Sequence, residues 1–285
     1  MQRMLIAVLA LALVTLPALS NAQDSALDRI RDSKTVTMGY RGDALPFSFK
    51  GPNGQPAGYT VELCKRVAAS IESQLKIPGL KVKWVEATSQ NRFELVEKHK
   101  VDMLCGATTA TLKRMERVDF SSYVFVDSTG VLARVSSGIR KFSDLSGKRI
   151  AVIAGTTNET ALKAALKRAL VNAEVVTFSS REAATAALEQ GKADAFASDK
   201  ILLEGIAGKF KDASKYAMLP DDLSIEPYAI MLPRGDSALR LEVNRALSRV
   251  FSSAAIRDIF VNTFGKDIEP TPLLRALYMI GYIPE

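Results

Sequence analysis

The sequence predicts an α/β protein of two lobes, in which each lobe holds a mostly parallel sheet flanked by helices and a cleft separates the lobes. Three observations support this prediction. Strand and helix patterns alternate between residues 36 and 105, the alternation restarts at residue 149, and the tail adds one strand and two helices. Alternating strands and helices are typical of parallel sheets covered by helices. About 260 residues follow a predicted leader segment, enough for one large or two modest domains.

Apolar periodicity defines the elements of the first half. Val36 and Met38 alternate with threonines, as in a strand with one buried face. Leu63 and Ile71 belong to a series at four-residue spacing, which indicates an amphipathic helix. Alternation around Trp84 indicates the next strand. The predicted elements are strands at 36–40, 81–86 and 101–105 and helices at 61–75 and 91–100.

The second half repeats this order. The segment Gly155-Thr156-Thr157 connects a strand to a helix, and Leu239, Val243 and Leu247 give a later helix its apolar face. The predicted elements are strands at 149–153, 175–178, 193–198 and 228–232, a helix that ends near residue 170, and helices at 181–190, 238–250 and 254–264.

The two halves resemble each other in outline. Lys100-Val101-Asp102-Met103 and Lys192-Ala193-Asp194-Ala195 each lead from a helix into a short strand with a polar end. Two such lobes place polar strand ends on either side of a cleft. Segments 123–129 and 224–228 are the predicted crossings, so the first lobe comprises 23–126 and 227–285 and the second 127–226.

The N-terminus indicates export. Arg3 precedes an apolar run at 4–16, and Pro17 and the small-residue pattern Ser20-Asn21-Ala22 follow it. This pattern predicts a signal peptide at 1–22 that is cleaved after Ala22. The run is too short to span a bilayer, and no second run of that kind occurs. We therefore expect a soluble, exported protein.

Composition narrows the function classes. The chain is 47% apolar and 24% charged, with a net charge of +7. The basic residues are dispersed, without the basic blocks and interleaved aromatics of a nucleic-acid surface, so we expect no nucleic-acid partner. The single histidine, His99, lies in a polar run. A lone histidine argues against most metal sites and against a Ser-His-Asp triad, so we expect neither metal nor cofactor.

Two cysteines leave two alternatives open. Cys64 lies on the helix pattern and Cys105 at a strand end, so the two side chains can meet across a helix–sheet contact. An oxidising compartment permits a disulfide between them, and two separately buried thiols are equally natural.

The segment Cys105 to Arg114 concentrates hydrogen-bond donors. It leads from an apolar strand into a loop with Thr108, Thr109 and Thr111, and Arg114 lies one helical turn further on. Donors that converge at a strand end suit a carboxylate or phosphate. An N-capped helix with a surface arginine is the alternative, since threonine is a common cap.

Several motifs, taken in order, resemble the periplasmic solute-binding proteins of amino-acid ABC transporters, and most of all the glutamate/aspartate-binding branch. The resemblance covers the whole mature chain. Its motifs are Gly39-Tyr40-Arg41 with Pro46-Phe47-Ser48, Gly58-Tyr59, Thr88-Ser89-Gln90-Asn91-Arg92, Cys105-Gly106-Ala107-Thr108-Thr109, Arg114 before Asp119-Phe120-Ser121, Gly155-Thr156-Thr157 and Ala195-Phe196-Ala197-Ser198-Asp199. It implies the two-lobed type II fold, with a free amino acid held between the lobes, and a monomeric protein in the periplasm.

The resemblance also implies roles for individual residues. Arg114 corresponds to the arginine that binds the α-carboxylate, for which a guanidinium fork is well suited. Thr109 and Thr157 correspond to hydroxyl and backbone donors to the same group, with Thr108 and Thr156 beside them. Asp199 corresponds to the acceptor of the α-ammonium.

The acidic branch carries extra groups for a second carboxylate. Arg41, Ser89 and Arg92 match them, and Arg181 occupies the position of a histidine in that branch. Ion pairs with Asp43 or Glu86 are the alternative role for Arg41 and Arg92, and a charge on the helix surface is the alternative for Arg181.

One position departs from the branch. Ala107 replaces the hydroxyl residue that is usual there. The ligand would lose one hydrogen bond, worth on the order of 1 kcal/mol.

The resemblance implies a hinged clamp that closes on an amino acid and is then read by an ABC transporter permease. Two other functions are kept as alternatives. One is an enzyme of the cyclohexadienyl dehydratase kind, which needs a general acid in the cleft, whereas the sequence leads us to expect no perturbed carboxylate pair. The other is a ligand-sensing partner of a membrane receptor.

Overall fold

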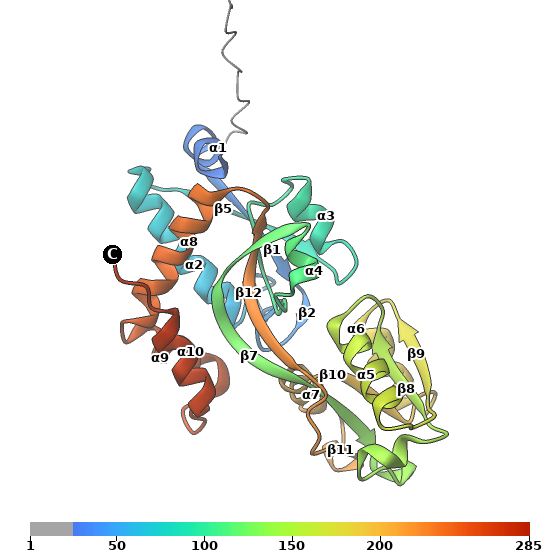
Figure 1. Cartoon of the computed structure of the whole chain (residues 1–285). Helices are drawn as coiled ribbons and strands as arrows, with labels where there is room; N and C mark the ends of the chain where they lie inside the picture. The colour runs from blue at the N-terminus through green and yellow to red at the C-terminus, as the bar shows by residue number, and fades with distance from the viewer. Residues whose placement is uncertain (1–24) are drawn as a thin grey trace, which may run out of the picture.

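A computed structural model describes residues 25–285, so the predicted signal peptide at 1–22 lies outside the described residues. The chain forms two bodies of unequal size that are joined by long strands (Figure 1). None of the helices between residues 25 and 285 has the length and apolar character needed to cross a membrane.

The larger body contains the N-terminal elements and the C-terminal helices. In its sheet, β1 lies between β5 and β6 and is parallel to both, and β12 adds an antiparallel strand beside β6. Helices pack on the sheet around core residues such as Met38, Leu63 and Val243. Its elements are α1 (Ala26–Ser33), β1 (Thr35–Arg41), β2 (Asp43–Ala44), β3 (Ser48–Lys50), β4 (Pro56–Ala57), α2 (Tyr59–Leu75), β5 (Lys81–Ala87), α3 (Arg92–Glu97), β6 (Met103–Cys105), α4 (Leu112–Met115), α8 (Ser237–Phe251), α9 (Ala255–Phe264) and α10 (Pro272–Gly281).

The smaller body holds one end of a nine-stranded sheet that continues from the larger body, and it has two apolar clusters. Strand β8 lies between β9 and β10 and is parallel to both. Ile150 and Val152 pack against Leu162 in one cluster, and Phe196 belongs to the other. The elements are β8 (Arg149–Ile153), α5 (Thr157–Arg168), β9 (Glu174–Phe178), α6 (Arg181–Glu189), β10 (Ala195–Asp199), α7 (Lys200–Ala207) and β11 (Tyr216–Met218).

Two antiparallel strands connect the bodies, as Figure 1 shows. Strand β7 (Val118–Arg134) pairs with β12 (Ile225–Pro233) as far as Ser128, and from Thr129 onward it pairs with β10. The crossings predicted at 123–129 and 224–228 lie on these strands. The lobe boundaries at 126/127 and 226/227 fall within or beside the same strands and stay a prediction.

The mostly parallel α/β architecture confirms the predicted fold class, and the differences have local causes. The strand predicted at 101–105 begins only at Met103, because the Asp102 carboxylate accepts a hydrogen bond from the Thr37 N–H at 2.8 Å. The helix predicted at 91–100 ends at Glu97, and His99 adopts a left-handed conformation with φ 52°. Helices α1, α7 and α10 and the full length of β7 were not predicted.

A disulfide joins the helix α2 to the strand β6. Cys64 and Cys105 are bonded to each other and fully buried, which confirms the disulfide alternative. The bond fixes the main helix of the larger body to the strand that leads directly into Thr108 and Thr109.

We expect loss of this disulfide to lower thermal stability. A cross-link between residues 41 positions apart lowers the conformational entropy of the unfolded chain, which raises the free energy of unfolding by about 4 kcal/mol. For a chain of this size the Cys64→Ser/Cys105→Ser variant should therefore unfold about 10 °C below the wild type. Differential scanning calorimetry of this variant, beside wild-type protein treated with reductant, measures the effect. Equal melting temperatures would show that the cross-link does not limit stability.

Candidate ligand-binding site

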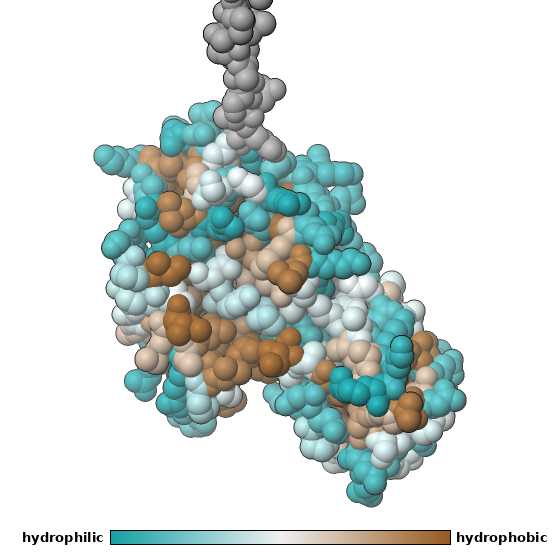
Figure 2. Space-filling view, viewed as in Figure 1, coloured by the Kyte–Doolittle hydropathy of each residue, from teal (hydrophilic) through white to brown (hydrophobic). Residues whose placement is uncertain are grey.

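The molecule narrows where its two bodies meet (Figure 2), and a large cavity opens between them. Its volume is about 1050 Å³. The larger body contributes the loop after β5, the segment after β6 and α4, and the smaller body contributes the start of α5. Five residues from the predicted site line it: Ser89, Thr109, Arg114, Thr156 and Thr157.

The segment after β6 positions Arg114. The Thr111 hydroxyl accepts a hydrogen bond from the Arg114 N–H at 3.2 Å and so caps the short helix α4. The Arg114 guanidinium donates to the Thr109 carbonyl at 2.7 Å and lies 5.4 Å from the centre of the Phe93 ring. Burial lowers the pKa of this guanidinium, while the charges of Glu226 and Asp199 raise it. Both interpretations of this segment therefore hold in part: Thr111 caps a helix, and Arg114 lines the cavity.

Arg92 is a neighbouring cation of Arg114 and is 4% exposed. Its guanidinium donates to the Thr108 hydroxyl at 3.2 Å and to the Ala107 carbonyl at 3.3 Å. Its Nε has no hydrogen-bond partner among the described residues. Burial lowers its pKa well below the usual value, and the neighbouring cations Arg114 and Arg41 lower it further. An anion that entered the cavity would relieve this concentration of positive charge.

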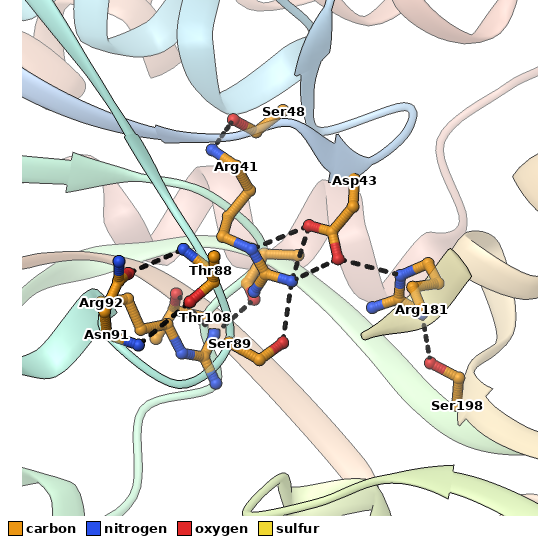
Figure 3. A network of polar contacts seen from close by, with 11 residues as sticks. Arg41, Asp43, Ser48, Thr88, Ser89, Asn91, Arg92, Thr108, Arg181 and Ser198 are labelled. Carbon is orange, nitrogen blue, oxygen red and sulfur yellow. Dashed lines mark hydrogen bonds and ion pairs between the residues drawn. The ribbon is translucent and has the colours of Figure 1, made fainter. Parts of the chain in front are cut away.

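A second cluster of polar contacts spans the two bodies (Figure 3). Arg41, at the end of β1, donates from Nε and Nη2 to the two oxygens of Asp43, each at 2.8 Å, and from Nη2 to the Ser89 hydroxyl at 2.9 Å. The Arg181 Nε lies 3.9 Å from Asp43, and its Nη1 donates to the Ser198 hydroxyl at 2.7 Å.

These contacts decide between the alternatives for two arginines. Arg181 is 8% exposed, so its interpretation as a helix-surface charge is wrong. Arg41 forms the ion pair with Asp43 that the sequence analysis kept as its alternative role. Burial opposes ionisation of Asp43, but the charges of Arg41 and Arg181 outweigh it and lower the pKa of that carboxyl.

The start of α5 brings polar groups from the smaller body to the cavity. Thr156 caps the helix, since its hydroxyl accepts from the Glu159 N–H at 3.2 Å and donates to the Ile153 carbonyl at 2.7 Å. Thr157 is the first helical residue. Its hydroxyl donates to the carboxylate of Glu226 at 2.7 Å. The N-terminus of α5 favours negative charge at this point.

Buried carboxylates lie near the arginines, although Asp127 and Asp199 are not among the residues that line the cavity. Asp199, at the end of β10, is 7% exposed, and burial together with the charge of Glu226 raises its pKa. Asp127 on β7 accepts hydrogen bonds from the Ile201 N–H at 3.2 Å and the Tyr228 hydroxyl at 3.3 Å. Burial and the charge of Asp199 raise the pKa of Asp127 to about 8. The expectation that the cleft holds no perturbed carboxylate pair is therefore wrong.

Sequence reasoning missed Asp127 and Glu226. Both lie on the predicted crossings, which were treated only as connections. The available signal is a carboxylate beside apolar residues in each predicted crossing. A segment that crosses between the lobes passes beside the cleft, so a charged side chain on it is a candidate for the site. Within residues 25–285, no cluster of three or more histidine, cysteine or acidic side chains is arranged to hold a metal ion.

Comparison with known proteins identifies the family. The family model of the bacterial extracellular solute-binding proteins, family 3, matches residues 36–266. The chain belongs to this family. A family 3 relative named as an L-glutamate/L-aspartate-binding protein from Pseudomonas aeruginosa is 32% identical over 92% of this chain and 87% of its own length. The glutamate/aspartate import solute-binding protein of Escherichia coli is 29% identical over 94% of this chain and 90% of its own.

Solved structures of similar proteins agree with the family 3 fold. An ancestral arginine-binding protein bound to glutamine has a TM-score of 0.72 and 25% identity, covering 82% of this chain and 99% of that one. The ancestral amino-acid-binding protein AncCDT-1, described as a precursor of cyclohexadienyl dehydratase, has a TM-score of 0.72 and 27% identity, covering 85% and 100%.

Proposed function

We propose that this family 3 protein captures a free amino acid in the cavity between its two bodies and delivers it to the permease of an ABC transporter. The observation that carries the proposal is a group of opposite charges where the two bodies meet, in which the charge of Asp199 acts on both Arg114 and Arg92. Arg114 and the start of α5 line the cavity and offer a site for an α-carboxylate. Asp199 does not line the cavity itself, but its charge acts on Arg114, and it offers an acceptor for an α-ammonium. The resemblance also supports a periplasmic location after cleavage of the signal peptide behind Ala22.

The charge balance favours an acidic amino acid. Asp127, with a pKa of about 8, holds its proton at neutral pH. The four arginines and the three remaining carboxylates of this group then sum to one net positive charge. Lys113, Arg117 and Glu159, which also line the cavity, add one more, so the site as a whole complements the net negative charge of glutamate or aspartate. The names of the relatives support the same choice. The residues in this count are the arginines Arg41, Arg92, Arg114 and Arg181 and the carboxylates Asp43, Asp127, Asp199 and Glu226.

Closure of the two bodies would complete the site. Ser89, Thr109 and Arg114 come from the larger body, whereas Thr157 and Asp199 come from the smaller body. A ligand that contacts both sets stabilises the closed arrangement, because only that arrangement offers all the contacts.

A thermal-shift screen against all common amino acids and small dicarboxylates tests the proposal. At a concentration a thousandfold above its dissociation constant, a ligand adds about 4 kcal/mol, or about 10 °C of melting temperature for a chain of this size. We expect L-glutamate and L-aspartate to give the largest shifts. No shift with any amino acid would overturn the binding function, and a largest shift with glutamine or arginine would overturn only the acidic preference.

A dehydratase activity is the second candidate. It is favoured by the protonated carboxyl of Asp127, a group that can supply a proton, and by the likeness to AncCDT-1. Incubation with prephenate or arogenate and chromatographic detection of the aromatic product separates the candidates. We expect no product, since Asp199 is assigned to the ligand's ammonium and the relatives are named as binding proteins.

A further inference from the structure

Glu226 is the most enclosed carboxylate at the cavity. It lies on β12 between the two bodies and is 1% exposed. No lysine or arginine among residues 25–285 forms an ion pair with it, and its partners are hydroxyl groups. The Oε2 atom accepts from Thr109 at 2.5 Å and from Thr157 at 2.7 Å. The Oε1 atom accepts from Ser224 at 2.5 Å and from Thr129 at 3.1 Å.

This arrangement fixes where two hydroxyl protons point. A hydroxyl group has one proton to donate and two lone pairs that accept, and an ionised carboxylate only accepts. The protons of Thr109 and Thr157 therefore point toward Glu226 Oε2. The two threonine oxygens lie 3.4 Å apart and keep their lone pairs for other partners. Both threonines also line the cavity, so what their hydroxyls offer a ligand is acceptor capacity.

The hydroxyls to which Glu226 binds come from both bodies. Thr109 follows β6 in the larger body, and Thr157 begins α5 in the smaller body. The two meet on one carboxylate oxygen. The orientation of both hydroxyls is thus set together, and only when the two bodies are close.

Building on the proposed function, we propose that Glu226 is a positioning residue. It accepts hydrogen bonds from the hydroxyls of Thr109 and Thr157, so that the two hydroxyl oxygens are left to accept hydrogen bonds from the ligand's α-ammonium. The α-carboxylate is then left to Arg114 and to backbone N–H groups at the start of α5. This assignment differs from the sequence analysis, in which the threonine hydroxyls donate to the carboxylate. The charge of Asp199 interacts with that of Glu226, and we assign Asp199 to the same ammonium site.

A double-mutant cycle tests whether Glu226 acts through Thr109. The protein and its variants are titrated with L-glutamate by calorimetry. Thr109→Val removes the hydroxyl and keeps the shape, and Glu226→Met keeps the length of the side chain and removes both acceptor oxygens. Each single variant should lose about tenfold or more in affinity, because each removes an oriented acceptor for a charged donor. Since both changes remove the same interaction, the affinity of the double variant for L-glutamate should lie within about threefold of the affinity of the weaker-binding single variant.

Additive losses would overturn the proposal, because they would mean that Glu226 acts on the ligand by its charge alone. Thr109→Ser is the conservative rescue, since it restores the hydroxyl and should recover most of the affinity that Thr109→Val loses. If Glu226→Met does not fold, the comparison of Thr109→Val with Thr109→Ser still decides, since equal affinities would overturn the assignment. A folded wild-type protein that binds no amino acid would overturn the proposed function and this assignment together.

Discussion

The Arg114→Ala variant is expected to lose on the order of a hundredfold or more in affinity for L-glutamate. Arg114 is the partly buried cation that faces the cavity beside the start of α5. Removing one partner of an enclosed, hydrogen-bonded charge pair costs roughly 2 to 5 kcal/mol, and each 1.4 kcal/mol is about a tenfold change in affinity. Isothermal titration calorimetry of wild type and variant under the same conditions measures the loss.

Two further variants sharpen this experiment. Arg114→Lys keeps the charge but loses the two-pronged geometry, so its affinity should lie between wild type and alanine. Arg31→Ala is the control, because Arg31 is an exposed arginine paired with Asp28 on α1 and does not line the cavity. Its loss should stay within about threefold. Folded Arg114→Ala protein with wild-type affinity would contradict the assignment of the carboxylate site.

The fold could be predicted because its strands and helices carry clear apolar periodicity. Val36 and Met38 mark β1, and Leu63 and Ile71 mark α2, all buried in the structure. The long strand β7 was not predicted as one element, since it changes partner from β12 to β10 and its buried positions do not alternate. Helix α10 was not predicted either, and it lies beyond the residues that the family model matches.

The candidate site was predictable where a motif marked a residue and not where only tertiary packing defines its environment. Arg114, Thr109 and Thr157 line one cavity, as expected of a shared site. Asp43 interacts with both Arg41 and Arg181. This arrangement depends on how the two bodies meet, which cannot be predicted from the spacing of residues in the sequence. The four hydroxyls around Glu226 come from four separate segments, so their convergence has no signature in the sequence.

The second large effect concerns pH and the buried carboxyl of Asp127. Its pKa is raised from 3.8 to about 8. Between these values the native protein keeps a proton that the unfolded chain has released, so the free energy of unfolding falls as pH rises. The slope is about 1.4 kcal/mol per pH unit, and the total effect of this group on the free energy of unfolding is on the order of 5 kcal/mol. The Asp127→Asn variant has no carboxyl group at this position, so its free energy of unfolding should not show this fall with rising pH.

Urea unfolding of the ligand-free protein between pH 5 and pH 8 measures this effect. The stability advantage of Asp127→Asn over the wild type should grow steadily with pH. Asp222→Asn is the matched control, since that exposed carboxyl has a pKa lowered by hydrogen bonds from Lys200 and Ser128 and should show no such gain at high pH. Parallel pH curves for wild type and Asp127→Asn would contradict the prediction.

The same proton links pH to ligand binding. Burial and the charge of Glu226 raise the pKa of Asp199, and the charge of Asp199 in turn holds the proton on Asp127. An ammonium group placed beside Asp199 favours the ionised form of both carboxyls, so binding should release a proton. The affinity of the wild type for L-glutamate should therefore rise from pH 5 to pH 8. Calorimetry in buffers of different ionisation enthalpy counts the protons released, and Asp127→Asn should release fewer than the wild type.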